Sequence, residues 1–381
     1  MEIGLHNIAL NLIKKGHNPI LLIPLKNYFL IKFKRVRLPY KILPTFPKLG
    51  FLLINIKSLT FFLFNLYLNI IVKIYKIDIF HVTSCYPVAV PIIKFSQKNN
   101  FPVIVRAVGV DIQKDYSLGY GLRLNKKVDK LIKHWIPKAD LLIATTKTVE
   151  QEYINIGVDK NKIVGIPNGV DISYFNSIKL SDRFIKNKQN QITFLTVGRY
   201  HKKKGFEILL SAIKILKRKN FSNFRLIMVG DKLKNHLYEF AQELNILDKV
   251  IFYDSLLDLQ NNKSSFALPD SELVTQYKEA DIFVLPSLVE SFGIVLIEAM
   301  AAELPIITTD GPGCKDVIEN GKFGYMVKAG SEKELADGMI YFLENKDVRL
   351  KYKSKSIIAS KNYDWPNIIN SYEKIYNTLL N

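Results

Sequence analysis

Acidic residues are missing from almost the whole first fifth of this 381-residue chain: no Asp or Glu occurs between Ile3 and Ile77. The same segment carries twelve Lys and Arg residues, so it contributes +12 of the formal net charge of +19. An AT-rich genome would explain a preference for Lys over Arg, but not the removal of acids from 75 consecutive positions. We therefore expect this segment to meet the anionic headgroups of a membrane. The alternative is a bias of composition alone.

Other absences exclude several classes of protein. Two cysteines, Cys85 and Cys314, lie far apart without metal-ligand spacing, which favours buried thiols in a reducing cytoplasm over a disulfide. No Asp-x-Asp motif occurs and the six histidines are scattered, so no metal is predicted. No nucleic-acid-binding motif accompanies the positive charge, so no nucleic-acid partner is predicted. No Gly-x-Gly-x-x-Gly follows an early strand, which argues against a nucleotide-binding dehydrogenase.

One long apolar segment, Leu49–Val72, has the hydropathy of a membrane span. Lys57 interrupts it and leaves about 15 residues, fewer than the roughly 20 that a spanning helix needs. Asn65, Asn69, Lys73 and Lys76 recur at steps of four, four and three, and form a polar stripe on one side of a helix. The pattern predicts a helix that is mostly buried or lies on the membrane surface.

Short apolar runs alternate with helical stretches along the whole chain, which predicts parallel, doubly wound α/β sheets. At this length two domains are expected. We place the N-terminal domain at 1–171, a polar linker at 172–190 and the C-terminal domain at 191–362. The predicted strands are 19–23, 78–82, 103–107, 140–144 and 162–166 in the first domain, and 191–197, 225–229, 250–253, 281–285 and 305–308 in the second.

The segment Glu290–Glu298, with the sequence ESFGIVLIE, follows the predicted strand 281–285. Gly293 lies in a loop, and a helix is predicted from Ile294. A strand, a Gly-containing loop and a helix N-terminus make a site for an anion. Carboxylates suit the hydroxyls of sugar and ribose, and the upstream Arg199 and Lys204 supply charge for phosphate. The combination predicts a site for a nucleotide-sugar.

Five sequence pieces, in this order and spacing, resemble the retaining family 4 glycosyltransferases, also called glycosyl transferases group 1. The pieces are PNGVD at 167–171, GR at 198–199 with KG at 204–205, ADIFVLPS at 280–287, ESFGIVLIE at 290–298 and GPG at 311–313. The resemblance extends from about Gly4 to the end of the chain. It implies the GT-B fold, in which two Rossmann-like domains face a cleft. In that family the last helix, here 363–381, crosses back to the N-terminal domain.

The resemblance also implies roles for individual residues. Arg199 and Lys204, next to Gly198, would stabilise the leaving diphosphate. Glu290 would contact the donor sugar, and Glu298 would hold the ribose hydroxyls. Backbone amides would face the sugar and diphosphate at the start of the helix. These amides belong to Phe292, Gly293 and Ile294.

The acceptor side is less clear from the sequence. Arg106 and Asp111 are the candidates for acceptor contacts. Val108 stands where many relatives have a His. His81 ends a predicted strand and either faces the acceptor or is merely packed.

One departure from the family concerns the start of the chain. Family members usually have a strand and a Gly-rich loop before the first helix, whereas this sequence opens in that helix, near Ile8–Lys15. We therefore expect the first strand of the N-terminal domain to be missing. A second departure is the segment 254–272, which is longer than the usual turn at this place in the family. We expect it to lie near the donor base.

The sequence as a whole favours a metal-independent, retaining glycosyltransferase of hexosyl type without a cofactor. The donor would be a nucleotide diphosphate-sugar, and the acceptor a lipid-linked or oligosaccharide hydroxyl in surface polysaccharide or lipid-linked glycan synthesis. The expected location is cytoplasmic, on the inner face of the membrane. The alternative, suggested by the missing strand and Val108, is an inactive or truncated GT-B domain that acts as a binding or scaffold protein.

Overall fold

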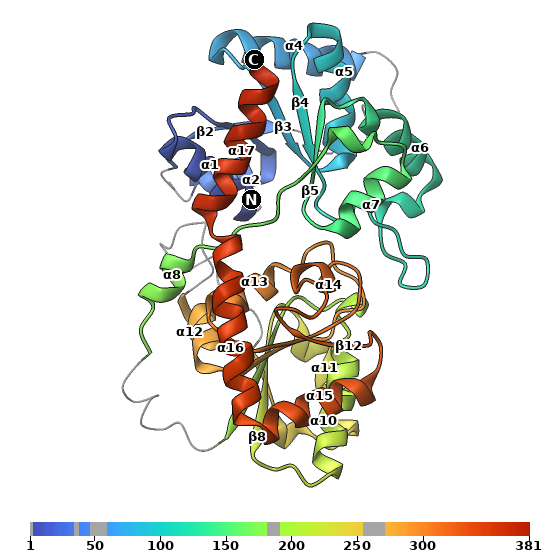
Figure 1. Ribbon diagram of the computed structural model, residues 1–381. Coiled ribbons are helices and arrows are strands. Elements are labelled where there is room, and N and C mark those ends of the chain that lie inside the picture. The colour runs from blue at the N-terminus through green and yellow to red at the C-terminus, as the bar shows by residue number, and fades with distance from the viewer. Residues whose placement is uncertain (1–2, 34–37, 46–58, 181–190, 254–270) are drawn as a thin grey trace. The chain divides into compact units, whose positions relative to one another are not determined.

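The computed structural model describes residues 3–33, 38–45, 59–180, 191–253 and 271–381 (Figure 1). The chain forms two compact units. The N-terminal unit comprises Met1–Pro167 and Trp365–Asn381, and the C-terminal unit comprises Asn168–Asp364. The division therefore falls a few residues before the predicted boundary at 171. The last helix, α17 (Trp365–Leu380), belongs to the N-terminal unit.

The main sheet of the N-terminal unit has four parallel strands in the order β3-β4-β5-β6. Every residue of β4 and β5 is buried. This is the pattern of a parallel sheet covered by helices on both faces. Each strand agrees with a predicted one within two residues. The bounds are β3 (Phe80–Thr83), β4 (Val103–Arg106), β5 (Leu141–Ala144) and β6 (Ile163–Gly165).

A second, two-stranded parallel sheet stands apart from the first. It pairs β1 (Ile20–Pro24), which was predicted, with β2 (Lys41–Thr45), which was not. Pro44 lies inside β2, and a proline argues against a strand when the sequence is read alone. Proline is tolerated at a sheet edge, where no backbone N–H is needed on the outer side.

Two layers of helices cover the sheets of the N-terminal unit. On one face, Ile8 of α1 and Tyr372 of α17 share a core cluster with Ile104 and Ile143 of the sheet. On the other face, Leu68 of α4 and Ile93 of α5 pack with further strand residues. The helices of this unit, besides α17, are α1 (Ile3–Lys14), α2 (Leu25–Phe33), α4 (Leu59–Tyr75), α5 (Val90–Asn99), α6 (Lys126–Trp135) and α7 (Lys147–Asn155).

The C-terminal unit is built on one six-stranded parallel sheet in the order β12-β11-β10-β7-β8-β9. From β7 the chain proceeds to β8 on one side and returns to β10 on the other side, so the strand order reverses between β7 and β10. In open α/β sheets, ligands bind beyond the carboxyl ends of the strands at such a point. The bounds are β7 (Ile192–Val197), β8 (Phe224–Val229), β9 (Val250–Tyr253), β10 (Ile282–Leu285), β11 (Ile306–Thr309) and β12 (Tyr325–Val327).

The helices of the C-terminal unit flank this sheet. The closing helix predicted at 331–344 is confirmed as α15, whereas α16 and the strand β12 were not predicted. The bounds are α8 (Ile172–Ser177), α10 (Phe206–Arg218), α11 (Leu233–Glu243), α12 (Ser271–Glu279), α13 (Ile294–Ala301), α14 (Cys314–Val317), α15 (Glu332–Glu344) and α16 (Lys346–Ser360).

Part of the predicted linker is helical, which corrects the expectation of an aperiodic segment at 172–190. Asp171 caps the short helix α8, because its carboxylate accepts the backbone N–H of Tyr174 at 2.9 Å. Residues 181–190 and most of the segment 254–272 lie outside the described residues.

Candidate active site

Two loops meet at the carboxyl ends of β7 and β10. The first runs from Gly198 to Gly205, and the second runs from Pro286 to Glu290. They pack closely, because a Cβ atom at Gly205, whose φ is +65°, would lie 2.2 Å from the carbonyl oxygen of Pro286. The backbone N–H of Leu288 donates to the carbonyl of Lys203 at 2.7 Å. The switch point of the sheet therefore brings together segments almost ninety residues apart in sequence.

Glu290 is the centre of this site. The residue is 5% exposed, and its carboxylate pairs with Lys204. Lys203 Nζ lies 3.5 Å from Oε2, and the Ser287 hydroxyl donates to Oε1 at 3.0 Å. Burial alone would raise the pKa of Glu290, but Lys204, Lys203 and Ser287 outweigh it, so the pKa lies below its ordinary value. The site therefore holds an ionised carboxylate between two ammonium groups.

The structure brings the predicted pair Lys204 and Glu290 into contact and adds Lys203 and Ser287, which were not predicted. The run of three lysines at 202–204 was the only sequence signal for Lys203. Arg199 lies at the start of the same loop, next to Gly198, with its side chain exposed. Within the described residues no ion pair holds the Arg199 guanidinium. Lys204 is thus anchored to Glu290, whereas Arg199 faces solvent.

The helix α13 begins at Ile294, directly after Gly293, which has a left-handed backbone with φ of +81°. No side chain among the described residues caps this end of α13. Its first backbone N–H groups carry partial positive charge and suit an anion. The side chain of Phe292 is buried against the ring of Tyr363, so only its backbone is available to a ligand. The side chain of Ile294 is 42% exposed.

The Gly311–Gly313 loop packs against Glu290 from another direction. The backbone N–H of Glu290 donates to the carbonyl of Pro312 at 2.9 Å. A Cβ atom at Gly313, whose φ is +78°, would lie 2.3 Å from the carbonyl oxygen of Glu290. Glycine is therefore required at this position to hold the Glu290 backbone.

Glu298 lies on α13, just over one helical turn after the first residue of that helix. It is half-buried, and Oε2 accepts a hydrogen bond of 2.8 Å from the hydroxyl of Tyr277. Burial raises the pKa of Glu298, and the Tyr277 hydroxyl opposes part of that rise. Tyr277 comes from α12 and is fully buried. The sequence did not identify Tyr277 as the partner of Glu298.

In the N-terminal unit, Asp111 is buried and its carboxylate is already engaged. Oδ1 accepts the backbone N–H groups of Val108 and Gly109 at 3.0 and 2.9 Å, and Oδ2 accepts that of Cys85. Burial raises the pKa of Asp111, although these N–H donors oppose the rise. The geometry gives Asp111 a structural function, which is to hold the loop after β4. Its predicted contact with an acceptor stays a prediction.

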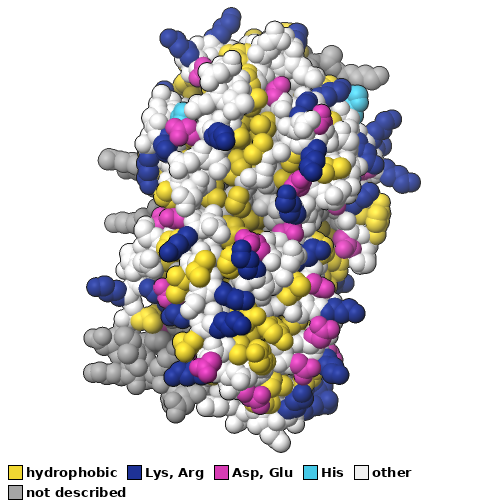
Figure 2. All heavy atoms as spheres, viewed as in Figure 1, with side chains coloured by type: hydrophobic (Ala, Val, Ile, Leu, Met, Phe, Trp, Pro, Cys, Tyr) yellow, Lys and Arg dark blue, Asp and Glu magenta, His cyan; other side chains and the backbone are white. Residues whose placement is uncertain are grey.

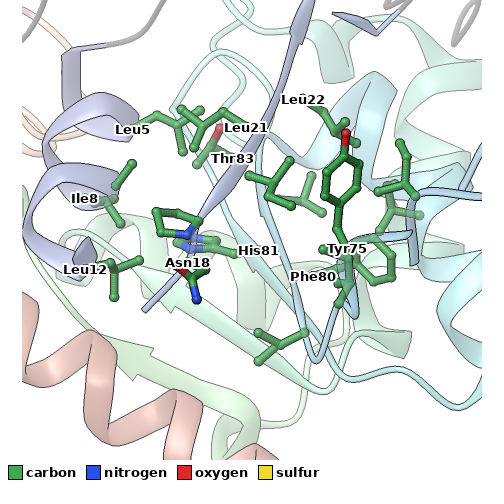
Figure 3. A pocket seen from close by; sticks show the side chains of 18 of the residues that line it. Leu5, Ile8, Leu12, Asn18, Leu21, Leu22, Tyr75, Phe80, His81 and Thr83 are labelled. Carbon is green, nitrogen blue, oxygen red and sulfur yellow. The ribbon is translucent and has the colours of Figure 1, made fainter. Parts of the chain in front are cut away.

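His81 packs against α17, as in the second of the two alternatives that the sequence left open, and it also lines a cavity of the N-terminal unit (Figure 3). Its Nδ1 lies 2.7 Å from the hydroxyl of Tyr376, and its ring packs against Tyr372. Burial and the nearby Arg106 lower the pKa of His81 to about 3, so the imidazole is neutral. Arg106 itself ends β4 and is 2% exposed. Its contact with an acceptor remains a prediction.

Comparison with known proteins identifies the family. Residues 1–174 match the family described as Glycosyltransferase Family 4, and residues 178–358 match Glycosyl transferases group 1. Together the two matches span nearly the whole chain.

The chain belongs to the family 4 glycosyltransferases.

Curated relatives match over part of their length. A phosphatidyl-myo-inositol mannosyltransferase of Mycobacterium tuberculosis is 30% identical over 227 residues, which cover 57% of this chain and 54% of the relative. An N-acetylgalactosamine-N,N'-diacetylbacillosaminyl-diphospho-undecaprenol 4-alpha-N-acetylgalactosaminyltransferase of Campylobacter jejuni is 28% identical over 244 residues, or 63% of this chain and 61% of the relative. The matches thus span little more than half of these relatives.

Solved structures match over almost the full chain. A glycosyltransferase from Rickettsia africae has a TM-score of 0.78 at 21% identity, covering 99% of this chain and 94% of that one. HepE from Anabaena, in complex with UDP-glucose, has a TM-score of 0.72 at 18% identity, covering 99% and 95%. These likenesses show the fold, which is GT-B, with two Rossmann-like units as predicted.

Proposed function

We propose that this protein is a retaining glycosyltransferase of hexosyl type. It moves a sugar from a nucleotide diphosphate-sugar to a hydroxyl group of a lipid-linked or oligosaccharide acceptor, in glycolipid or surface polysaccharide synthesis. Membership of family 4 supports the reaction class. The names of the mannosyl- and N-acetylgalactosaminyltransferases above support a lipid-linked acceptor, and the complex of HepE with UDP-glucose supports a nucleotide-sugar donor.

One observation carries the proposal: the ionised Glu290, between Lys203 and Lys204, lies in the loop that leads into α13. In the transfer, the bond between the sugar and the diphosphate breaks, and negative charge grows on the leaving phosphate. Fixed cations and helix N–H groups stabilise this developing charge more than they stabilise the bound donor. Glu290 would accept hydrogen bonds from sugar hydroxyls. Lys204 and Arg199 would take the phosphate charge without a metal or a cofactor.

A donor panel tests the proposal. The purified chain is mixed with UDP-, GDP- and ADP-sugars; binding is followed by thermal shift and transfer by release of the nucleoside diphosphate. We expect one donor to stabilise the chain and to be consumed, with transfer lost in Glu290→Gln. Binding of a donor without any turnover, in the presence of polyprenyl phosphate-linked and free glycan acceptors, would instead support the inactive binding protein.

We further propose that the protein works on the inner, cytoplasmic face of a membrane through α4. Three residues at helical spacing on this helix are strongly exposed: Phe62 at 62%, Ile70 at 48% and Ile74 at 65%. Leu63 and Leu66 extend the same apolar surface. A helix with an exposed apolar stripe inside a strongly basic segment is typical of interfacial binding. None of the helices that the structure describes combines the length and apolarity needed to cross a bilayer.

The sign of the charge supports anionic lipid as the partner. The exposed lysines 14, 15, 26, 41, 73 and 76 belong to the acid-free segment, whereas the side chains of residues 32, 34, 35 and 37 lie outside the described set. On the face drawn in Figure 2, basic side chains are spread over both units with acidic ones between them. The excess charge alone therefore does not mark a membrane surface, and the apolar stripe of α4 carries the proposal.

Vesicle flotation with a matched control tests this surface. Replacement of Leu66 and Ile70 with Ser should abolish most flotation with vesicles that contain anionic lipid. The control replaces two equally exposed apolar residues of α16, Leu350 and Ile358, which are 52% and 59% exposed. Binding of the wild type should also fall as salt screens the basic residues. Equal flotation of the α4 variant and the α16 control would refute the proposal.

A further inference from the structure

The pairing of β7 with β8 continues past the ends of both strands. The backbone N–H of Gly198 donates to the carbonyl of Val229 at 2.9 Å. Two residues further along, the backbone N–H of Tyr200 donates to the carbonyl of Asp231 at 3.3 Å. A step of two residues on each side is that of a parallel ladder. Residues 198–200 are therefore held as an extension of β7.

The direction of the Arg199 side chain follows from this extension. Successive side chains of a strand point to opposite faces of the sheet, so residue 199 shares a face with residues 195 and 197. Leu195 and Val197 pack in one core cluster with Leu296 of α13. Arg199 therefore leaves the end of the strand on the face that α13 covers. The start of that helix suits an anion, because its first N–H groups carry partial positive charge.

Tyr200 leaves the extension on the opposite face, where its ring and its hydroxyl are both held. Phe194, on the same face, belongs to the core cluster of α10, against which Tyr200 packs. The Tyr200 hydroxyl donates to Oε1 of Glu207, in the first turn of α10, at 2.7 Å. Its ring stacks on that of His236 of α11, with the centroids 4.1 Å and the planes 11° apart. The residue that follows Arg199 is thus fixed to two helices.

Arg199 depends on this support because nothing around its own side chain is packed. The side chain is exposed, whereas Tyr200 is half-buried. The neighbouring Glu207 raises the pKa of Tyr200 to about 12, so the hydroxyl remains a donor. Catalytic charges act most strongly when they are already aimed at the charge that develops in the transition state. The fixed neighbour supplies that aim, since it sets the direction in which residue 199 leaves the backbone.

We propose that Tyr200 is a positioning residue for Arg199. By anchoring the extension of β7 to α10 and α11, Tyr200 directs Arg199 toward the start of α13, where the diphosphate of the donor would lie. Tyr200 itself would touch neither the sugar nor the phosphate. This inference rests on the proposed function, because it requires that Arg199 binds the diphosphate of a nucleotide-sugar.

A double-mutant cycle between the two positions tests the proposal. Release of nucleoside diphosphate from the panel of UDP-, GDP- and ADP-sugars is measured for the full chain and for Arg199→Ala, Tyr200→Ala and the double variant. Tyr200→Ala should lower turnover at least about fivefold, because a misplaced charge loses much of its effect. In the Arg199→Ala background the same change should lower turnover less than about twofold. Tyr200→Phe keeps the stack on His236 and loses only the hydrogen bond, so its effect should be smaller.

Tyr238 supplies the matched control. It lies on α11, as His236 does, and is 40% exposed. Its ring packs against Phe252, on the neighbouring strand β9, and not against the loop that carries Arg199. Tyr238→Ala should leave turnover unchanged in both backgrounds.

The outcomes separate this inference from the proposed function. An effect of Tyr200→Ala that requires Arg199 supports the proposal, because partial unfolding would lower turnover by the same factor in both backgrounds. Equal factors in both backgrounds overturn it, as does an unchanged turnover in Tyr200→Ala or an equal loss in Tyr238→Ala. Wild-type turnover in Arg199→Ala alone is a different result, since it contradicts the donor site itself and removes the basis of the inference with it.

Discussion

Removing the ammonium group of Lys204 should destabilise the C-terminal unit as well as impair catalysis. The side chains of Glu290 and Lys204 are 6% and 16% exposed, so their ion pair is largely shielded from water. Removal of one partner from a buried pair typically costs 3–5 kcal/mol, roughly, because the other charge stays buried. Lys203, at 3.5 Å from the same carboxylate, compensates in part. We therefore expect Lys204→Met to lower the free energy of unfolding by about 2–3 kcal/mol.

A double-mutant cycle isolates the interaction energy between Glu290 and Lys204. Glu290→Gln removes the charge that Lys204→Met leaves unpaired, so the double variant should regain most of the stability but none of the activity. We expect a coupling energy of about 2 kcal/mol at pH 7 between the two positions. Unfolding should be followed by calorimetry, because both tryptophans, Trp135 and Trp365, lie in the N-terminal unit and fluorescence would report that unit alone.

The pH dependence gives the cycle an internal control. The pKa of Glu290 in the folded protein lies below its ordinary value of 4.5. The stability that the pair contributes is therefore fully present above pH 4.5 and is lost as the pH falls through the folded pKa. The coupling energy should shrink accordingly in acid. A coupling below about 0.5 kcal/mol at pH 7 would refute the reasoning, since that is the scale of an exposed pair.

Three further predictions follow from the same structure. Arg199→Ala should lower turnover at least about tenfold, as expected for a lost charge-assisted bond to phosphate. The Tm should be unchanged, because the side chain is exposed. An unaltered turnover would remove Arg199 from the donor site. Glu298→Gln should weaken binding of the free nucleoside diphosphate in calorimetry, whereas Glu290→Gln should leave this binding unchanged. Tyr277→Phe should weaken the binding by a smaller factor, because only the hydrogen bond that orients Glu298 is lost. Burial lowers the pKa of His81 to about 3, so the folded protein keeps this imidazole neutral. The free energy of unfolding should therefore be greatest above the ordinary pKa of about 6.5, and should fall as the pH is lowered from 6.5 to 3, by up to about 1.4 kcal/mol per pH unit. His81→Phe should flatten this slope, and an unchanged slope would show that His81 does not cause it.

Local patterns in the sequence were enough to predict most of the sheets. The strand β9 has the predicted bounds, and the other predicted strands shift by no more than two residues. Short apolar runs between polar turns are typical of buried parallel strands whatever surrounds them. β2 was missed because Pro44 disfavours a strand, and only its place at an edge makes the proline acceptable.

The partners of the site residues depended on tertiary contacts. The sequence placed Glu290 and Lys204 in one site, but not as an ion pair, and it gave no sign that Tyr277 donates to Glu298. Such contacts join residues 21 to 86 positions apart, at distances set by how helices and loops pack on the sheet. The sequence also gave no sign that the Asp111 carboxylate accepts backbone N–H groups of its own loop.

The sequence by itself determined most of the order of strands and helices, the two-domain division and most of the charged residues near the donor loops, because each depends on local periodicity and composition. Only the tertiary structure decided which carboxylates are paired, which face of α4 remains exposed, and that a cavity is lined by both β1 and β3. These features arise from packing between distant segments, and the local sequence does not encode the distance or angle at which two elements meet.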